Sequence, residues 1–249
     1  MIKANEIRQP NRIKIGEPFF ILLEIFSVLF PLYFGLRING WTGISHIRFG
    51  GDLVLLGGPF AYLGLAGSMI MMALVRVIRQ SDFSQIGLAR INKIGLTIIK
   101  GLGVALAVFG AVIFIINPLL NIIPGLEPRN MDRFTILRNN PAALVLNIGA
   151  MWFTAAFFEE LVWRGFLIER LMALLSSDKL ISKIMVLVIS AAVFGLAHAY
   201  QGPAGMIKTG AIGLVFGAAY LLLGRDLWPL ILAHGLIDTL DFISHFYGG

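Results

Sequence analysis

Long apolar segments separated by short polar ones run through almost the whole chain. A helix that crosses the hydrocarbon of a bilayer needs about 20 mostly apolar residues. The segments that meet this requirement are residues 18–36, 53–75, 94–116, 143–168, 181–199, 204–223 and 228–247. The pattern predicts an all-α fold, a polytopic membrane bundle of seven or eight transmembrane helices. The absence of a fixed-period repeat favours one integral membrane domain over residues 1–249.

Three polar segments give further expectations about the connections. Residues 76–93 are basic and amphipathic, which favours an interfacial helix on the inner leaflet over a partner-binding site. Residues 117–142 contain the proline-rich stretch NPLLNIIPGLEPRN and are expected to form the longest, turn-rich connection. Residues 1–17 mix acidic with basic residues before a span-length apolar run, which indicates an uncleaved first helix rather than a signal peptide. The basic residues concerned are Lys3, Arg8, Arg12 and Lys14.

Composition and charge support a membrane protein. Hydrophobic residues make up 57% of the chain and charged residues 14%, whereas soluble domains carry about 25% charged residues. The net charge of +6 is spread between apolar spans, without the basic face that nucleic-acid binding requires, so membrane lipids are the expected partners. Most Lys and Arg residues fall on one side of the predicted spans, which predicts a cytoplasmic N-terminus. A loop-poor chain without targeting signals favours a prokaryotic plasma membrane.

The absence of cysteine excludes several kinds of site. Disulfides, a thiolate nucleophile and thiolate metal ligands all require that residue. The ionisable residues within the predicted spans are the candidate functional residues, because such residues are rare in membrane spans and usually functional. They are Glu24, Glu159, Glu160, Arg164, His198, His234, Asp238, Asp241 and His245.

The stretch FFEELVWRGF places two adjacent carboxylates among apolar residues. Glu160 and Arg164 are four residues apart with the acid first, the favourable orientation for an ion pair on a helix. A structural pair that neutralises the helix is as good an interpretation of these two residues as a catalytic one. Glu159 is rotated by about 100° from Glu160 on an α-helix, so it needs a partner from elsewhere.

Two later stretches each carry polar side chains on one helix face. In FGLAH, Phe194 and His198 are four residues apart, and in HGLID, His234 and Asp238 have the same spacing. Gly235 allows another helix or a substrate backbone to approach closely. If these groups converge with Glu159, they supply a base, a place for water and charge stabilisation in a secluded cavity.

The remaining ionisable residues have simpler interpretations. A structural hydrogen bond is the expected role of Glu24, and His245 is expected at the membrane interface near the chain end. A lone His198 would more often be a satisfied histidine at a helix end. Asp241 follows Asp238 on roughly the same side of its helix, and its role stays open.

These stretches resemble the motifs of the CAAX-protease and bacteriocin-processing family, also called Abi or CPBP, of intramembrane proteases. The family pattern is Glu-Glu-x-x-x-Arg, then Phe-x-x-x-His, then His-x-x-x-Asn or Asp. Here the three motifs read EELVWR at 159–164, FGLAH at 194–198 and HGLID at 234–238, in the family's order. The resemblance implies a membrane-embedded endopeptidase with a catalytic core at about residues 143–247. Its substrate would be a peptide or protein that is prenylated or membrane-inserted.

The resemblance also implies roles for individual residues. Glu159 would be the catalytic carboxylate and His198 would hold or activate the water. Glu160, Arg164 and Phe194 would support the site, and His234 and Asp238 would complete it.

The cofactor stays open between two alternatives. In a metal-free, glutamate-dependent protease the third motif donates hydrogen bonds to the oxyanion, which suits Asn better than an ionised Asp238. In a metalloprotease, His198, His234 and Asp238 would ligate Zn²⁺ and Glu159 would act as the base. Asp238 shifts the balance slightly toward the metal.

Other functions fit the sequence less well. The chain has no His-Glu-x-x-His, no Gly-x-Ser-x-Gly and no Walker A or dinucleotide motif. A catalytically silent immunity or scaffold protein of the same family is the main alternative, in which the polar cluster binds a peptide or a partner protein. A transporter is third, because paired interrupted helices in two similar halves are missing.

Overall fold

The computed structural model describes residues 17–176 and 179–248. Residues 1–16, which include the basic residues Lys3, Arg8, Arg12 and Lys14, lie outside the described residues. The predicted orientation of the N-terminus therefore stays a prediction.

Helices dominate the described chain, with one small hairpin between the first two. The α-helices are α1 (Glu17–Thr42), α2 (Pro59–Ile78), α3 (Ile94–Ala111), α4 (Asn117–Asn121), α5 (Pro141–Met151), α6 (Ile168–Leu175), α7 (Leu180–Ala197), α8 (Gly202–Leu222) and α9 (Trp228–Tyr247). Two π-helices continue them, η2 (Val112–Ile116) and η4 (Trp152–Leu167). Three short 3₁₀-helices are η1 (Phe83–Ile86), η3 (Asp132–Leu137) and η5 (Ala199–Gln201). The strands are β1 (His46–Gly50) and β2 (Leu53–Leu56).

The predicted class, a polytopic membrane helical bundle, is confirmed. Within the described residues, six helical segments are long and apolar enough to cross a membrane: 17–42, 59–78, 94–121, 141–175, 180–197 and 199–222. The seventh predicted span is also a helix, α9, of 20 residues. It carries the ionisable residues of the third motif and is not among those six.

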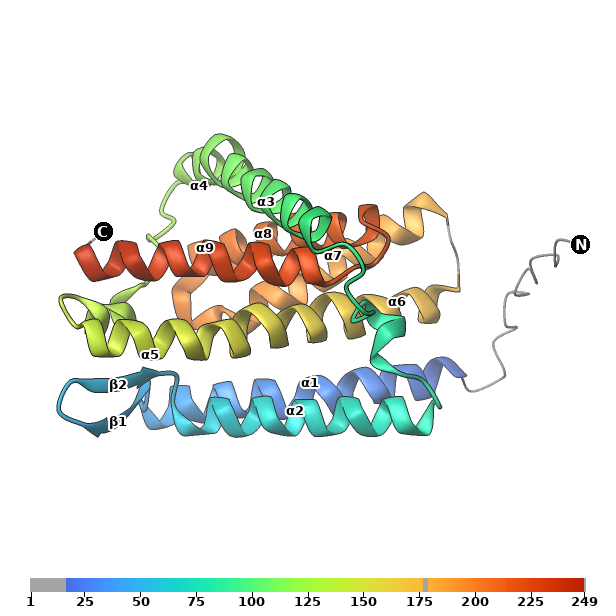
Figure 1. Ribbon diagram of the computed structural model, residues 1–249, viewed down its shortest axis with the longest axis horizontal. Helices are drawn as coiled ribbons and strands as arrows, with labels where there is room; N and C mark the ends of the chain where they lie inside the picture. Colours follow the sequence, from blue (N-terminus) through green and yellow to red (C-terminus); the bar gives the residue numbers. More distant parts are fainter. Residues whose placement is uncertain (1–16, 177–178, 249) are drawn as a thin grey trace, which may run out of the picture.

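Small residues allow the helices to pack closely. In Figure 1, α1 and α2 form an antiparallel pair along one side, the continuous helix α5–η4–α6 crosses the middle, and α3 lies across α9. Gly35 of α1 faces Gly64 of α2, where a Cβ on Gly35 would lie 3.0 Å from the Gly64 Cα. Gly195 of α7 meets Gly210 of α8 at 3.2 Å in the same way. Such contacts are typical of membrane bundles, where helices associate through close packing.

The second predicted span begins later than expected. Residues 53–56 form β2, which pairs antiparallel with β1, and α2 begins only at Pro59. The hairpin turns at Gly50 and Gly51, both with positive φ. Gly57 also has a positive φ and Pro59 starts the next helix, so the backbone between the apolar residues of β2 and α2 cannot stay helical.

The prediction of an interfacial helix over residues 76–93 is wrong. The helix α2 ends at Ile78, and Gln80 and Gly87 have positive φ. Asp82 caps the short η1 by accepting hydrogen bonds from Ser84, which lowers the pKa of its carboxyl. The segment is fastened to the bundle instead. The Tyr220 hydroxyl donates to the Ile86 carbonyl at 3.0 Å, and the Trp228 Nε1–H donates to the Ala89 carbonyl at 2.7 Å.

The third span extends past its predicted end at residue 116. The helix α3 continues through η2 and α4 to Asn121, because Pro118 stands in the first turn of α4, where no backbone N–H is needed. The connection that follows contains η3 and is tied to η5 by the Asn130 N–H, which donates to the Gln201 carbonyl at 3.0 Å.

Glu24 belongs to a chain of ion pairs at one end of the bundle. Its Oε1 accepts from Arg79 Nε at 2.6 Å and its Oε2 accepts from Arg170 Nη1 at 3.0 Å. Glu169 accepts from both Arg170 and Arg76 at 2.7 Å. These contacts join α1, α2 and α6, so the acid in the first span has a structural role.

Asn147 of α5 fastens the hairpin to the bundle. Its Nδ2 donates to the Val54 carbonyl and its Oδ1 accepts from the Leu56 N–H, both at 2.7 Å. The side chain is buried, as are Val54 and Leu56. These two hydrogen bonds hold the hairpin in a fixed position against α5.

An Asn147→Leu variant is expected to loosen the hairpin. The substitution leaves two buried backbone groups of β2 without partners, at a cost of about 1–3 kcal/mol each. Amide hydrogen exchange over residues 46–56 should accelerate at least tenfold while exchange in α7 stays unchanged. Equal protection in variant and parent would show that Asn147 does not hold the hairpin.

Candidate active site

The first motif lies in an unusual helix. Residues 152–167, which include Glu159, Glu160 and Arg164, form the π-helix η4 between α5 and α6. The sequence pattern predicts an ordinary α-helix here. Segments of π-helix are rare and occur often at functional sites, because they change which side chains share a face.

A cavity of about 510 Å³ lies next to this helix. Its walls come from η4, from the end of α7, from α8 and α9, and from the hairpin side of the bundle. The candidate catalytic residues that line it are Glu159, His198, His234 and Asp238. The supporting residues Arg164 and Phe194 line it as well. The four catalytic candidates, of which the first and last are 79 positions apart in the sequence, therefore line one cavity.

Glu160 is the hub of a buried polar network. Its carboxylate is fully buried, and its Oε1 accepts from Arg164 Nη1 at 2.9 Å and from His234 Nδ1 at 2.8 Å. Arg164 is 2% exposed, and its guanidinium lies over the rings of Phe194 at 4.5 Å and Phe216 at 5.1 Å. Burial makes these contacts strong and makes any unpaired member costly.

The second histidine of the motif set therefore pairs with Glu160 rather than with Glu159. The sequence pattern predicts that Glu159 reaches across to His198 and His234. In the described residues, Glu159 has no hydrogen bond or salt bridge, and its side chain lines the cavity. A half-buried carboxylate without a hydrogen bond or salt bridge is free to take up a proton from a water molecule that enters the cavity.

His198 caps the end of α7 and presents one ring nitrogen to the site. Its Nδ1 lies 2.9 Å from the Phe194 carbonyl, which can only accept, so the proton is on Nδ1. The ring also packs edge-to-face on Phe194, with centroids 4.7 Å apart. The hydrogen bond on Nδ1 leaves Nε2 as an acceptor. The ring contact gives a physical reason for a Phe four residues before the His, because it holds the imidazole in place.

His234 lies between two carboxylates. Its Nδ1 contacts Glu160, and its Nε2 lies 3.4 Å from Asp238 Oδ2 on the next turn of α9. A carboxylate only accepts hydrogen bonds, so both contacts are satisfied when both ring nitrogens carry hydrogen. Asp238 is 29% exposed and faces the cavity.

Gly235 is required by its neighbour Trp152. A Cβ at this position would lie 2.6 Å from carbons of the Trp152 ring. The indole Nε1–H donates to Thr239 Oγ1 at 3.1 Å, one turn further along α9. The glycine therefore brings η4 against α9 beside His234, a close helix approach of the kind that its position predicts.

The donor set can be tested as a zinc site. Two imidazoles and a carboxylate bind Zn²⁺ at about 2.0–2.2 Å. Across residues 17–176 and 179–248, no three His, Asp or Glu side chains lie together closely enough to hold a metal ion. His234 is engaged by Glu160 and Asp238 instead. The arrangement does not fit a three-ligand zinc site, and we derive no catalytic step through a metal.

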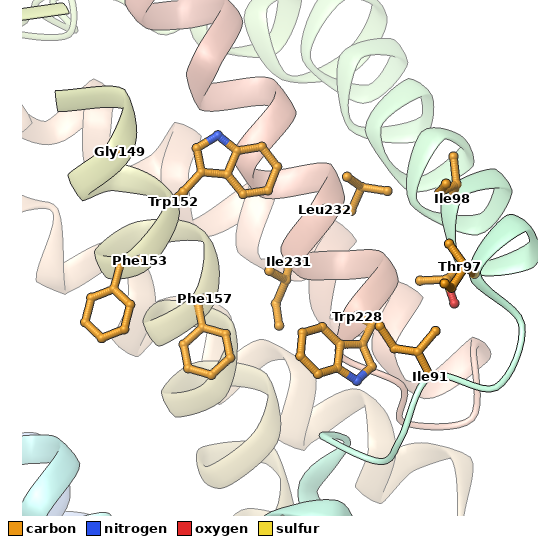
Figure 2. A pocket seen from close by; sticks show the side chains of 11 residues that line it. Ile91, Thr97, Ile98, Gly149, Trp152, Phe153, Phe157, Trp228, Ile231 and Leu232 are labelled. Atoms are coloured by element: carbon orange, nitrogen blue, oxygen red, sulfur yellow. The ribbon is translucent and has the colours of Figure 1, made fainter. Parts of the chain in front are cut away.

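A second cavity, of about 550 Å³, lies on the other side of η4. Figure 2 shows the rings of Trp152, Phe153, Phe157 and Trp228 around it, with Thr97 as the polar side chain among aliphatic ones. No ionisable residue lines this cavity. Among its described lining residues it has no group that could activate water, so the candidate active site remains the first cavity.

The sequence pattern does not single out several residues that line the first cavity. Arg129 and Arg133 come from the long connection and from η3, and Lys208 comes from α8. Gln201, just after the second motif, accepts from Arg129 Nε at 2.7 Å. A basic residue in a loop is ordinary in a membrane protein, so spacing carries no signal for them. The packing of the connection against η5 brings Arg129 and Arg133 to the site, and α8 brings Lys208.

A comparison with known protein families bears on these motifs. Residues 141–240 match the family model described as type II CAAX prenyl endopeptidase Rce1-like. No curated protein and no solved structure matches the chain. The matched region contains EELVWR, FGLAH and HGLID. The resemblance indicated by these motifs is confirmed, and over residues 141–240 the chain is similar to the Rce1-like type II CAAX prenyl endopeptidases.

Proposed function

We propose that the protein is an intramembrane endopeptidase that hydrolyses a peptide bond in a lipid-associated or membrane-inserted substrate. One observation carries the proposal. Of two adjacent carboxylates, Glu160 is buried and its Oε1 is engaged by both Arg164 and His234, while the half-buried Glu159 lines the cavity without a hydrogen bond or salt bridge in the described chain. A carboxylate without a counter-charge lowers the stability of the fold. Because Glu159 lines the same cavity as two histidines, it can serve as a base there.

In the proposed mechanism, Glu159 is the general base. It takes a proton from a water while the water oxygen attacks the carbonyl carbon of the substrate. His198 accepts a hydrogen bond from the same water through Nε2, because Nδ1 is held by the Phe194 carbonyl. The peptide C–N bond then breaks, and Glu159 returns the proton to the leaving amine.

We assign to His234 the role of stabilising the negative charge on the oxygen of the tetrahedral intermediate. An ionised Asp238 cannot donate a hydrogen bond to an oxyanion. The His234 ring is placed between Glu160 and Asp238, which stabilise it with hydrogen on both nitrogens. Glu160 therefore orients the ring through Nδ1, and the Nε2–H, whose contact with Asp238 is long at 3.4 Å, is the donor that we assign to the oxyanion.

A cleavage assay with a His198→Ala variant tests this assignment. The purified protein in lipid nanodiscs is incubated with a library of prenylated and membrane-inserted peptides, and products are identified by mass spectrometry. The variant is expected to lose at least about 100-fold in kcat/KM because the water loses its acceptor. His46→Ala on the hairpin is the matched control, since His46 lines neither cavity.

The result also separates the enzyme from a silent scaffold. If His198→Ala cleaves as fast as the parent, the mechanism is wrong. If neither protein cleaves any peptide of the library while both bind partner peptides, the chain acts as a binding protein of the same family.

A further inference from the structure

Three cations line one wall of the active-site cavity. They are Arg129, Arg133 and Lys208. In the part of the chain that the structure describes, none of them forms a salt bridge. Charges that are partly buried are normally paired or bind a ligand. The part of the cavity formed by these three residues, the cationic wall, therefore lacks an anion.

Arg133 is held in place by two aromatic rings rather than by acids. Its guanidinium carbon lies 4.8 Å from the Phe134 ring centroid and 4.4 Å from that of Tyr200. Its Nε is buried and has no hydrogen-bond partner within the described residues. Cation–π contacts orient the guanidinium but satisfy none of its N–H groups, so the donor is left for a ligand.

Arg129 is positioned by the turn that follows the second motif. Its Nε donates to Gln201 Oε1 at 2.7 Å, and Thr209 donates to the same oxygen at 3.3 Å. A Cβ on Gly205 would lie 2.2 Å from the Gln201 Cβ and 3.3 Å from the Arg129 Cγ. The glycine is therefore necessary for this packing, and the rest of the guanidinium stays available for an anion.

Asp241 is the acid that faces this wall most directly. It lines the same cavity, but its Oδ2 lies 3.7 Å from His245 Nε2, and it has no salt bridge with Arg129 or Lys208 within the described chain. One carboxylate, shared with a histidine, does not neutralise three cations. The excess positive charge persists beside the catalytic residues.

The cationic wall lies close to the catalytic histidine. The Tyr200 ring, which Arg133 covers, lies 5.8 Å from the His198 ring. The Gln201 N–H, next along the chain, donates to the His198 carbonyl at 2.9 Å. A peptide cleaved at Glu159 would reach this wall within a few residues of extended chain.

We propose that Arg129, Arg133 and Lys208 bind the free C-terminal carboxylate of the peptide substrate. The inference rests on the proposed function and adds which group of the substrate the site recognises. The planar fork of Arg133 suits a carboxylate, and Lys208 adds a point charge. The enzyme is then selective for bonds near a chain end, because an internal peptide segment brings no anion to this wall.

The test uses one fluorescent farnesylated peptide in two forms, with a free C-terminal carboxylate and with a C-terminal amide. Binding is measured on the Glu159→Gln protein in phosphatidylcholine nanodiscs, so that it does not depend on cleavage. The acid form is expected to bind roughly 10- to 100-fold more tightly than the amide. Lys208→Gln and Arg133→Gln, each added to the same protein, should abolish the difference by weakening the acid form alone. Lys93→Gln, at an exposed lysine outside both cavities, should preserve it.

Cleavage of the two forms by the parent and by Lys208→Gln gives a second readout. The parent should show a higher KM for the amide at similar kcat, and the Lys208→Gln variant should treat both forms alike. Failure of the proposed function appears as no cleavage of either form, whatever the binding result. Equal binding of acid and amide by the Glu159→Gln protein would overturn the carboxylate site. So would discrimination that survives both substitutions, or binding that responds to added phosphatidylglycerol but not to the peptide terminus.

Discussion

A Glu159→Gln variant is expected to lose about 100- to 10,000-fold in kcat/KM for peptide cleavage while remaining fully folded. Gln keeps the shape of Glu but cannot accept the proton of the attacking water at neutral pH. Because Glu159 has no hydrogen bond or salt bridge in the described structure, the substitution breaks neither kind of interaction. It also removes a half-buried carboxylate that has no salt bridge in the described chain, so the melting temperature should stay equal or rise.

The measurement pairs steady-state cleavage with thermal unfolding in the same nanodiscs. Glu127→Gln in the exposed connection is the matched control, and it should change neither quantity. Cleavage by Glu159→Gln at the parent's rate would remove Glu159 from the mechanism. A large fall in melting temperature would instead assign it a structural role.

The adjacent acid is expected to behave in the opposite way. Glu160→Leu should lower the free energy of unfolding by about 3–5 kcal/mol, because it leaves the buried Arg164 guanidinium without its counter-charge. Arg164 Nη1 and His234 Nδ1 both lose the oxygen that accepts from them. The freed His234 ring can then rotate, so cleavage should fall as well.

A double variant separates the ion pair from the rest of this effect. Glu160→Leu with Arg164→Met replaces both charges by apolar side chains of similar volume. Much of the lost stability should return, because no uncompensated charge remains. Activity should not return, since His234 still lacks the carboxylate that orients it. If Glu160→Leu alone is as stable as the parent in denaturant unfolding, the pair does not stabilise the bundle.

The contrast between the two glutamates shows how far local spacing can be used. The Glu160–Arg164 contact follows from a spacing of four residues on one helix, and the structure contains it at 2.9 Å. The contact between Glu160 and His234 joins residues 74 positions apart. The pattern assigns both histidines to Glu159 because Glu160 already has a partner in its own helix. A carboxylate oxygen can accept more than one hydrogen bond, which local counting does not reveal.

The errors in the connections have a similar origin. The segment 76–93 has the composition of a surface helix, but Gln80 and Gly87 take positive φ and the bundle supplies its hydrogen bonds through Tyr220 and Trp228. The apolar residues 53–56 have the composition of a span, but they pair with β1 and are fastened by Asn147. In both places tertiary hydrogen bonds outweigh local propensity.

The sequence by itself determined the membrane bundle, the approximate spans and the three motifs. These follow from the length of the apolar segments and from i,i+4 spacing, which are properties of single helices. The tertiary structure alone decided that η4 is a π-helix, that His234 pairs with Glu160, and that Arg129 and Arg133 reach the cavity. Those features depend on how distant segments pack, because a side chain finds its partner only when the helices and connections around it are in place.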